Sequence, residues 1–256
     1  MSLFNEKLNN IQLKDLLLLI IFILVIKLFM DYLNLIQIDL SWIYFVIIFY
    51  FFIRFRGCFS SFKEDFLKIF TFESLKLVVG IVILNIFVSY GLLYLSDFIL
   101  QFIPSLSPLI LFNTFNSVFA FGSFITTVIL SPIAEELIFR GVLLNKLKLI
   151  VQMSFSILIS SILFASLHSF GGIIAAFIFA VCMSILYLKT DNILVPIFAH
   201  FLNNFIAECI VIIDKSNVLF TDVNVMMVMS ILAIISAILI FIVVKNQWNV
   251  LNINKL

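Results

Sequence analysis

The residues best suited to chemistry lie within 131–144, SPIAEELIFRGVLL, where Glu135, Glu136 and Arg140 interrupt an apolar run. A charged side chain at the centre of a membrane helix costs about 2.5–3.5 kcal/mol on insertion scales, so this cluster needs a reason. On a helix Glu136 precedes Arg140 by four residues, the favourable order for an ion pair. Glu135 lies about 100° around the helix from Glu136. The spacing predicts that Glu136 is neutralised structurally, whereas Glu135 points into a cavity.

The only two histidines of the sequence both lie in apolar stretches near other polar groups. His168 follows Phe164 by about one helical turn, and His200 precedes Asn204 by four residues, so each pair shares a helix face. At about 1.5 Å per residue, Glu135, His168 and His200 lie about 18, 24 and 12 Å from the predicted cytoplasmic ends of their helices. These depths are compatible with one intramembrane cavity.

A carboxylate and two imidazoles can activate water in two ways. Glu135, His168 and His200 can hold Zn²⁺ with an open fourth position, where the metal makes water nucleophilic near neutral pH. Without a metal, a desolvated glutamate can act as general base, while the Asn204 amide donates to a developing oxyanion. No carboxylate is obviously spare to orient His168, and Asn204 suits His200 as a second donor. We therefore favour glutamate-activated water and keep zinc as the alternative; both describe amide hydrolysis inside the bilayer.

The elements that must position these residues are membrane helices. Of the 256 residues, 64% are hydrophobic and only 11% are charged, and the mean hydropathy is +1.28. A soluble domain carries about 25% charged residues. The sequence predicts an all-α polytopic bundle with about eight spans of roughly 20 apolar residues. The spans are placed near 15–33, 38–53, 77–99, 117–140, 152–168, 172–188, 193–213 and 224–244.

Two connecting segments have distinct compositions. Residues 54–76 mix charges with phenylalanine at helical spacing, which predicts either an amphipathic helix at the cytoplasmic surface or a solvated connector. Residues 100–116 contain two prolines and no charge, which predicts a loop at the outer surface.

The charge distribution predicts the orientation and the partners. Nearly all lysines and arginines outside the spans fall on one side if both termini are cytoplasmic, and only Lys215 falls on the other. We expect one membrane domain over residues 1–256, in a bacterial cell membrane. Its partners are the lipid bilayer and a membrane-associated peptide or protein, not nucleic acid. The three cysteines lack the spacing of a disulfide framework or a zinc site.

Three short motifs, in order, resemble those of the CPBP family over about residues 117–212. That family groups type II CAAX prenyl proteases with bacterial bacteriocin-processing and immunity proteins, also called Abi. The motifs are Glu-Glu-x-x-x-Arg at Glu135, Glu136 and Arg140, Phe-x-x-x-His at Phe164 and His168, and His-x-x-x-Asn at His200 and Asn204.

The resemblance implies an intramembrane endopeptidase. In that reading Glu135 activates water, and His168 helps to hold it. His200 and Asn204 polarise the scissile carbonyl. The second glutamate and the arginine of the first motif support the site. The resemblance leaves open whether a metal takes part, since family members are described both ways.

Two other classes of function stay open at this point. A bacteriocin-immunity or other binding protein would not need catalysis, and a proton-coupled transporter would use the same buried acids and histidines as a relay. Four further polar residues are expected to have no catalytic role. Glu208, Lys27 and Asp97 lie near span ends and are expected to snorkel, and Asn85 is expected to form an interhelical hydrogen bond.

Overall fold

The computed structural model describes residues 3–33, 39–102, 121–168, 172–216 and 218–253. Within these ranges every regular element is a helix, so the predicted all-α fold is confirmed. Most of the predicted 100–116 loop lies outside the described residues, and its first residues belong to a helix instead.

The helices before the gap that precedes residue 121 are α1 (Leu3–Asn10), α2 (Leu13–Tyr32), α3 (Leu40–Arg54), α4 (Phe59–Ile69) and α5 (Phe72–Phe102). The later separate helices are α9 (Met153–Ala165), α10 (Ile173–Thr190), α11 (Leu194–Ile213), α12 (Val218–Thr221) and α13 (Val223–Ile253).

Between these two groups, residues 121–147 form one helical run with two π-helical segments. The run comprises α6 (Phe121–Ile125), η2 (Thr126–Leu130), α7 (Ser131–Glu136), η3 (Leu137–Leu144) and α8 (Asn145–Leu147). A π-helical turn widens the helix and changes which backbone carbonyls find a partner in the next turn, and such turns are frequent at functional sites.

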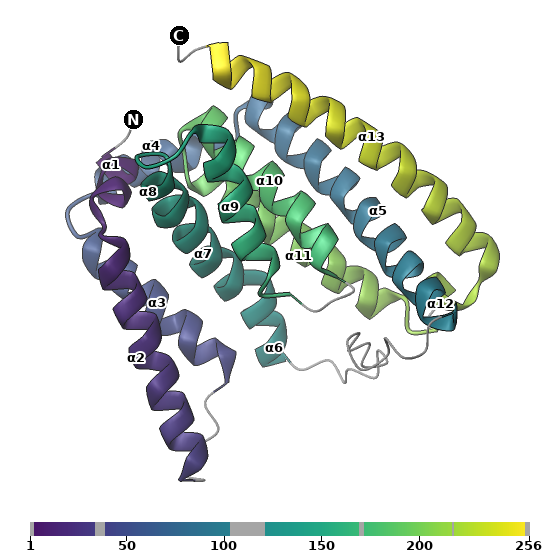
Figure 1. The fold of residues 1–256 in the computed structure, drawn as a ribbon, viewed down its shortest axis with the longest axis horizontal. Coiled ribbons are helices and arrows are strands. Elements are labelled where there is room, and N and C mark those ends of the chain that lie inside the picture. Colours follow the sequence, from purple (N-terminus) through teal and green to yellow (C-terminus); the bar gives the residue numbers. More distant parts are fainter. Residues whose placement is uncertain (1–2, 34–38, 103–120, 169–171, 217, 254–256) are drawn as a thin grey trace.

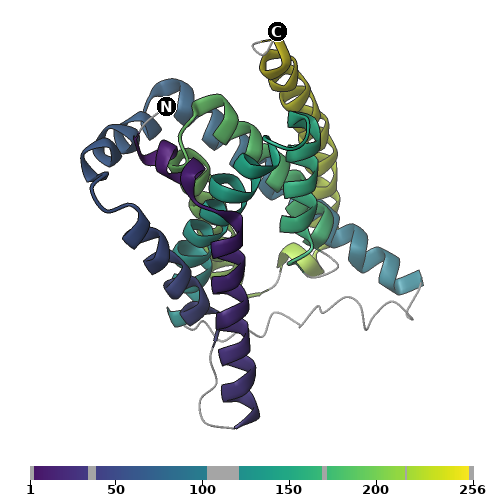
Figure 2. The ribbon, with the colours of Figure 1, turned by 60° about the vertical axis from the view of Figure 1, so that its left-hand side comes forward.

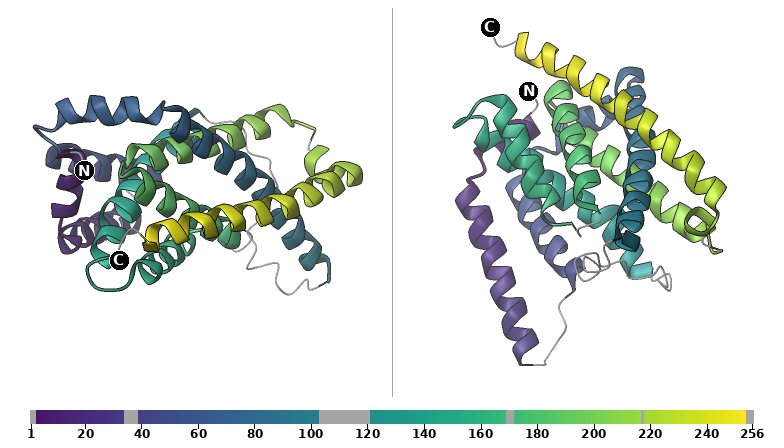
Figure 3. Two further views of the ribbon diagram at one scale, coloured as in Figure 1. Left: turned by 90° about the horizontal axis from the view of Figure 1, so that it is seen from above. Right: turned by 45° about the vertical axis from the view of Figure 1, so that its right-hand side comes forward.

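The run that carries Glu135 lies in the middle of the bundle, with α9, α10 and α11 beside it (Figure 1). α3 contacts η2 and α7 from one side, and α11 contacts them as well. On the far side α5 packs against α13, α10 and α11. Figure 2 shows α2 and α3 on the other flank. α13 runs beside α5 in Figure 1, and both views in Figure 3 show the two helices crossing. The motif-bearing helices are thus enclosed by two flanks.

The crossing of α5 and α13 depends on a small residue. A Cβ atom placed on Gly91 would lie 2.2 Å from the Cβ atom of Ala233, too close for two carbon atoms. The absence of a side chain therefore lets the two helix backbones approach closely, as small residues do in membrane bundles.

Among the described residues, four helices are long and apolar enough to cross a membrane: 72–95 of α5, α10, α11 and 223–248 of α13. The apolar helices within α3 and α9 are shorter. A helix is present at each of the eight predicted span positions. The exposed side chains of α2 and α13 are largely aliphatic or aromatic, as expected for surfaces that face lipid.

Asp39 caps the beginning of α3, and the amphipathic helix α4 follows its end. Asp39 caps α3 by accepting hydrogen bonds from the backbone N–H groups of Ser41 and Trp42. A hydrogen bond from the Ser41 hydroxyl lowers the pKa of the Asp39 carboxyl. Beyond α3, α4 confirms a helix within 54–76. It exposes Phe62 and Phe66, whereas Asp65, between them in the sequence, is buried.

Candidate active site

The Glu136 carboxylate is fully buried and binds two cationic or ionisable partners. Its Oε1 accepts a hydrogen bond from Nη1 of Arg140 at 3.0 Å and lies 2.9 Å from Nδ1 of His200. Arg140 is also fully buried, and its Nη2 donates to the backbone carbonyl of Ala180 at 2.9 Å. The predicted ion pair between Glu136 and Arg140 is confirmed. The contact with His200, from a helix 64 residues later, was not predicted.

Glu135 has a different set of partners. Its Oε1 accepts hydrogen bonds from the hydroxyl of Tyr44, at 2.8 Å, and from the hydroxyl of Ser131 on its own helix. Its exposed fraction is 9%, against 0% for Glu136. Both donors are neutral and both use Oε1, so Oε2 is the oxygen left to accept a proton. Tyr44, on α3, is the site residue that sequence reasoning missed.

The Phe164 ring is the centre around which three site residues pack. Its centroid lies 4.9 Å from the His168 ring and 6.0 Å from the His200 ring. The Arg140 guanidinium carbon lies 4.6 Å above the same ring, a cation–π distance. Phe164 is itself only 1% exposed, so it is firmly held. This packing places both imidazoles on one aromatic side chain, although they come from different helices.

His168 lies just beyond the C-terminus of α9. Its Nδ1 is 3.1 Å from the carbonyl oxygen of Phe164, one of the last carbonyls of that helix. Because a carbonyl only accepts, Nδ1 carries the proton and Nε2 faces away from this contact. The side chain is exposed, unlike that of His200.

Asn204 is held by its neighbours rather than by His200. Its Nδ2 donates to the carbonyl oxygen of Thr127 at 2.9 Å, and its Oδ1 accepts from Nδ2 of Asn203 at 3.2 Å. Thr127 lies on η2, so this bond ties α11 to the helical run that carries Glu135. His200 and Asn204 share a face of α11, as their spacing predicts. They bind different partners, however: His200 contacts Glu136, and Asn204 donates to Thr127.

The zinc alternative can be compared with this geometry. Each imidazole has an acceptor at Nδ1, so the orienting partners that a metal site needs are present. However, among the described residues no three His, Cys, Asp or Glu side chains converge to hold a metal ion. As arranged, Glu135, His168 and His200 do not converge on a point where they could bind a zinc ion together.

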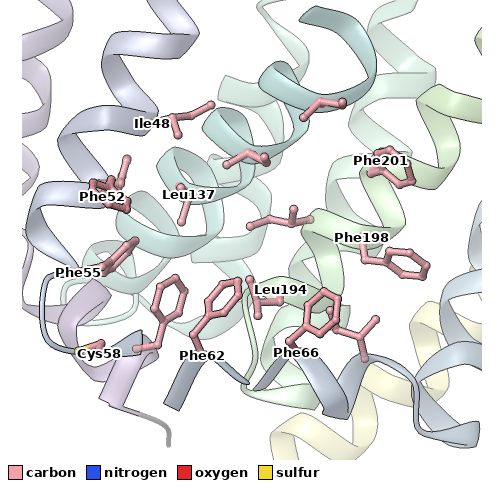
Figure 4. A pocket seen from close by; sticks show the side chains of 16 residues that line it. Ile48, Phe52, Phe55, Cys58, Phe62, Phe66, Leu137, Leu194, Phe198 and Phe201 are labelled. Atoms are coloured by element: carbon pink, nitrogen blue, oxygen red, sulfur yellow. The ribbon is translucent and has the colours of Figure 1, made fainter. Parts of the chain in front are cut away.

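An apolar pocket of about 410 Å³ lies beside the helix that carries Glu135. In Figure 4 α3 contributes Ile48 and Phe52 to one wall, together with Phe55 just after its end, and α11 contributes Phe198 and Phe201 to the other. Phe62 and Phe66 of α4 form the lower edge of the pocket in this view. Ile129, Ile133 and Leu137, each one turn apart on the helical run that carries Glu135, also line it. Tyr44 lies one turn before Ile48 on α3. The pocket therefore lies beside α3, which carries Tyr44, and beside the helical run that carries Glu135.

Comparison with protein families places the motifs in a known group. Residues 116–206 match the family described as type II CAAX prenyl endopeptidase Rce1-like. This stretch is similar to that family, and we call it the Rce1-like domain. The suspected CPBP resemblance is thereby confirmed, and the Rce1-like domain contains every motif residue from Glu135 to Asn204. Neither the search of curated proteins nor the search of solved structures finds a match. Tyr44 and Asn85 lie outside the Rce1-like domain, although each donates a hydrogen bond to a residue within it: Tyr44 to Glu135, and Asn85 to Asn203.

Proposed function

We propose that the protein is an intramembrane endopeptidase in which Glu135 activates water. The observation that carries the proposal is the difference between two adjacent carboxylates. Glu136 is neutralised by Arg140 and contacts His200, whereas the hydrogen bonds to Glu135 among the described residues come from two neutral hydroxyls, both at Oε1. An anionic carboxylate with a free oxygen in an apolar site is suited to general-base catalysis. The Rce1-like domain supports this class of function.

In the proposed reaction Oε2 of Glu135 takes a proton from water as the water oxygen bonds to the scissile carbonyl carbon. The carbonyl oxygen becomes an oxyanion, toward which Asn204 donates the Nδ2 hydrogen that Thr127 does not bind. His200, whose Nδ1 is held by Glu136, supports this side of the site. The C–N bond then breaks, and the proton on Glu135 passes to the leaving amine. His168 helps to hold the attacking water. Donors positioned for a developing oxyanion supply much of the acceleration in acyl transfer.

The proposed substrate is a membrane-associated peptide or protein. The pocket between α3 and α11 is lined almost wholly by phenylalanine and aliphatic residues, so it suits an apolar segment. Because the bulk of the bundle surface is also apolar, such a substrate can reach the site from within the bilayer.

The test is a comparison of membrane peptidomes from cells that produce the wild-type protein or Glu135→Ala at equal abundance. We expect a defined set of membrane precursors to accumulate, and their cleavage products to disappear, with Glu135→Ala. Glu208→Ala, which changes another partly buried glutamate, is the matched control and should resemble wild type. Identical peptidomes for wild type and Glu135→Ala would contradict the proposal.

A further inference from the structure

A chain of three asparagine amides connects α5 to the candidate active site. Nδ2 of Asn85 donates to Oδ1 of Asn203 at 3.1 Å, and Nδ2 of Asn203 donates to Oδ1 of Asn204 at 3.2 Å. Nδ2 of Asn204 then donates to the carbonyl oxygen of Thr127 at 2.9 Å. Asn85 is 2% exposed and lies 118 residues from its partner, so the chain bridges α5, α11 and η2 within the bundle.

The direction of this chain is fixed by its last member. A backbone carbonyl can only accept, so Asn204 must turn its NH₂ group toward Thr127 and its oxygen toward Asn203. Asn203 must then donate from its NH₂ group to the oxygen of Asn204, and Asn85 must donate in the same way to the oxygen of Asn203. The orientation of the Asn204 amide therefore depends on the two asparagines behind it.

The Thr127 carbonyl is available because of the local sequence. In an α-helix it would accept from the N–H of Ser131, but that N–H donates to Thr126 instead. In a π-helical turn it would accept from residue 132, which is Pro132 and has no N–H. The acceptor that ends the amide chain is thus created by the proline of the segment that carries Glu135.

We propose that Asn85 and Asn203 are positioning residues that orient Asn204 toward the scissile carbonyl. The inference rests on the proposed function and extends the site to two residues beside the motifs. Asn204 has two Nδ2 hydrogens, and Thr127 binds one. The amide chain directs the other, which is the hydrogen available to a substrate oxyanion.

Toward the described residues, Asn85 uses only the donor end of its amide. Its Oδ1 is buried and has no hydrogen-bond partner among the described residues. Burying an unsatisfied carbonyl oxygen costs stability, and an apolar residue of similar volume would avoid that cost. Asn85 is therefore explained by what its Nδ2 does for Asn203.

The experiment uses the purified full-length protein with Asn85→Leu and, as a second variant, Asn203→Leu. The matched control is Asn145→Leu. Asn145 is also a buried asparagine, but it donates to Gly141 and Tyr187, away from this chain. The probe is a fluorescence-quenched prenylated peptide that ends in a CAAX sequence. The second readout is the side-chain NH₂ resonance of Asn204 in protein labelled with ¹⁵N-asparagine.

We expect Asn85→Leu and Asn203→Leu to lower kcat about 10-fold or more with little change in KM, as loss of an orienting partner does. Both variants should also shift the Asn204 NH₂ resonance. The control should change thermal stability without changing kcat or that resonance. An unshifted resonance, or a shifted resonance with wild-type kcat, would overturn the positioning role.

The two proposals fail in distinguishable ways. If Glu135→Gln cleaves the probe as wild type does, the proposed function fails. If Glu135→Gln is inactive but both leucine variants are fully active, only the positioning role fails. If the wild-type protein does not cleave this probe, the Asn204 resonance decides whether the amide chain orients Asn204, since an unshifted resonance overturns it without any turnover.

Discussion

The two adjacent glutamates of α7 have different hydrogen-bond partners. On one side Glu136 is sealed from solvent, paired with the Arg140 guanidinium and in contact with His200. On the other side Glu135 accepts hydrogen bonds from the hydroxyls of Tyr44 and Ser131. The first arrangement uses the charge of a glutamate to balance other charges. The second holds one oxygen in place and leaves the negative charge available for chemistry.

The largest expected effect belongs to Glu135→Gln. The amide cannot accept a proton from water, so turnover should fall by about 10²–10⁴-fold, the usual contribution of a general base. Thermal stability should change little, because Tyr44 and Ser131 can still donate to the amide oxygen. Turnover and thermal unfolding are measured on the same purified protein, with Glu208→Gln as control. Activity near that of wild type would remove Glu135 from the mechanism.

Glu136→Gln should act mainly on stability. It leaves the fully buried Arg140 without a counter-charge, and breaking a buried pair in this way costs about 3–5 kcal/mol. We expect lower abundance in the membrane and a lower unfolding midpoint. Adding Arg140→Met should recover part of the loss, because no unpaired charge then remains. The interpretation fails if Glu136→Gln is as stable as wild type.

Tyr44→Phe should have the smallest effect of the three. It removes one hydrogen bond to an ionised carboxylate, about 1.5–3 kcal/mol, so turnover should fall roughly 10- to 100-fold if the whole bond matters in the transition state. The matched control is Tyr50→Phe on the same helix, since the Tyr50 hydroxyl has no hydrogen-bond partner among the described residues. Equal activities of these two variants would show that Tyr44 does not hold Glu135 for catalysis.

Much of this arrangement follows from local sequence patterns. The four-residue spacing predicts the bond between Glu136 and Arg140, and the rotation of about 100° predicts that Glu135 lies elsewhere. The burial of a polar residue in an apolar helix predicts that Asn85 forms an interhelical hydrogen bond, which the contact with Asn203 confirms. The predictions for Glu135 and Glu136 succeed because helix geometry determines them, and the prediction for Asn85 succeeds because a buried polar group needs a partner.

The contacts that sequence reasoning missed are tertiary. Tyr44 lies 91 residues from Glu135, and no motif marks it among the aromatic residues of α3. The contact between His200 and Glu136 likewise depends on how α11 packs against α7. One signal was available: Pro132 lies five residues after Thr127, so it removes the N–H that a π-helical turn would offer to that carbonyl. Packing decides which side chain takes such a vacant acceptor.

The central claim is that the Glu135 carboxylate activates water without an obligatory metal. The most direct test is metal analysis of the purified, active protein, together with turnover before and after treatment with a chelator. The account predicts zinc well below one ion per protein and turnover that survives chelation. Stoichiometric zinc, with activity lost to the chelator and restored by added zinc, would contradict it.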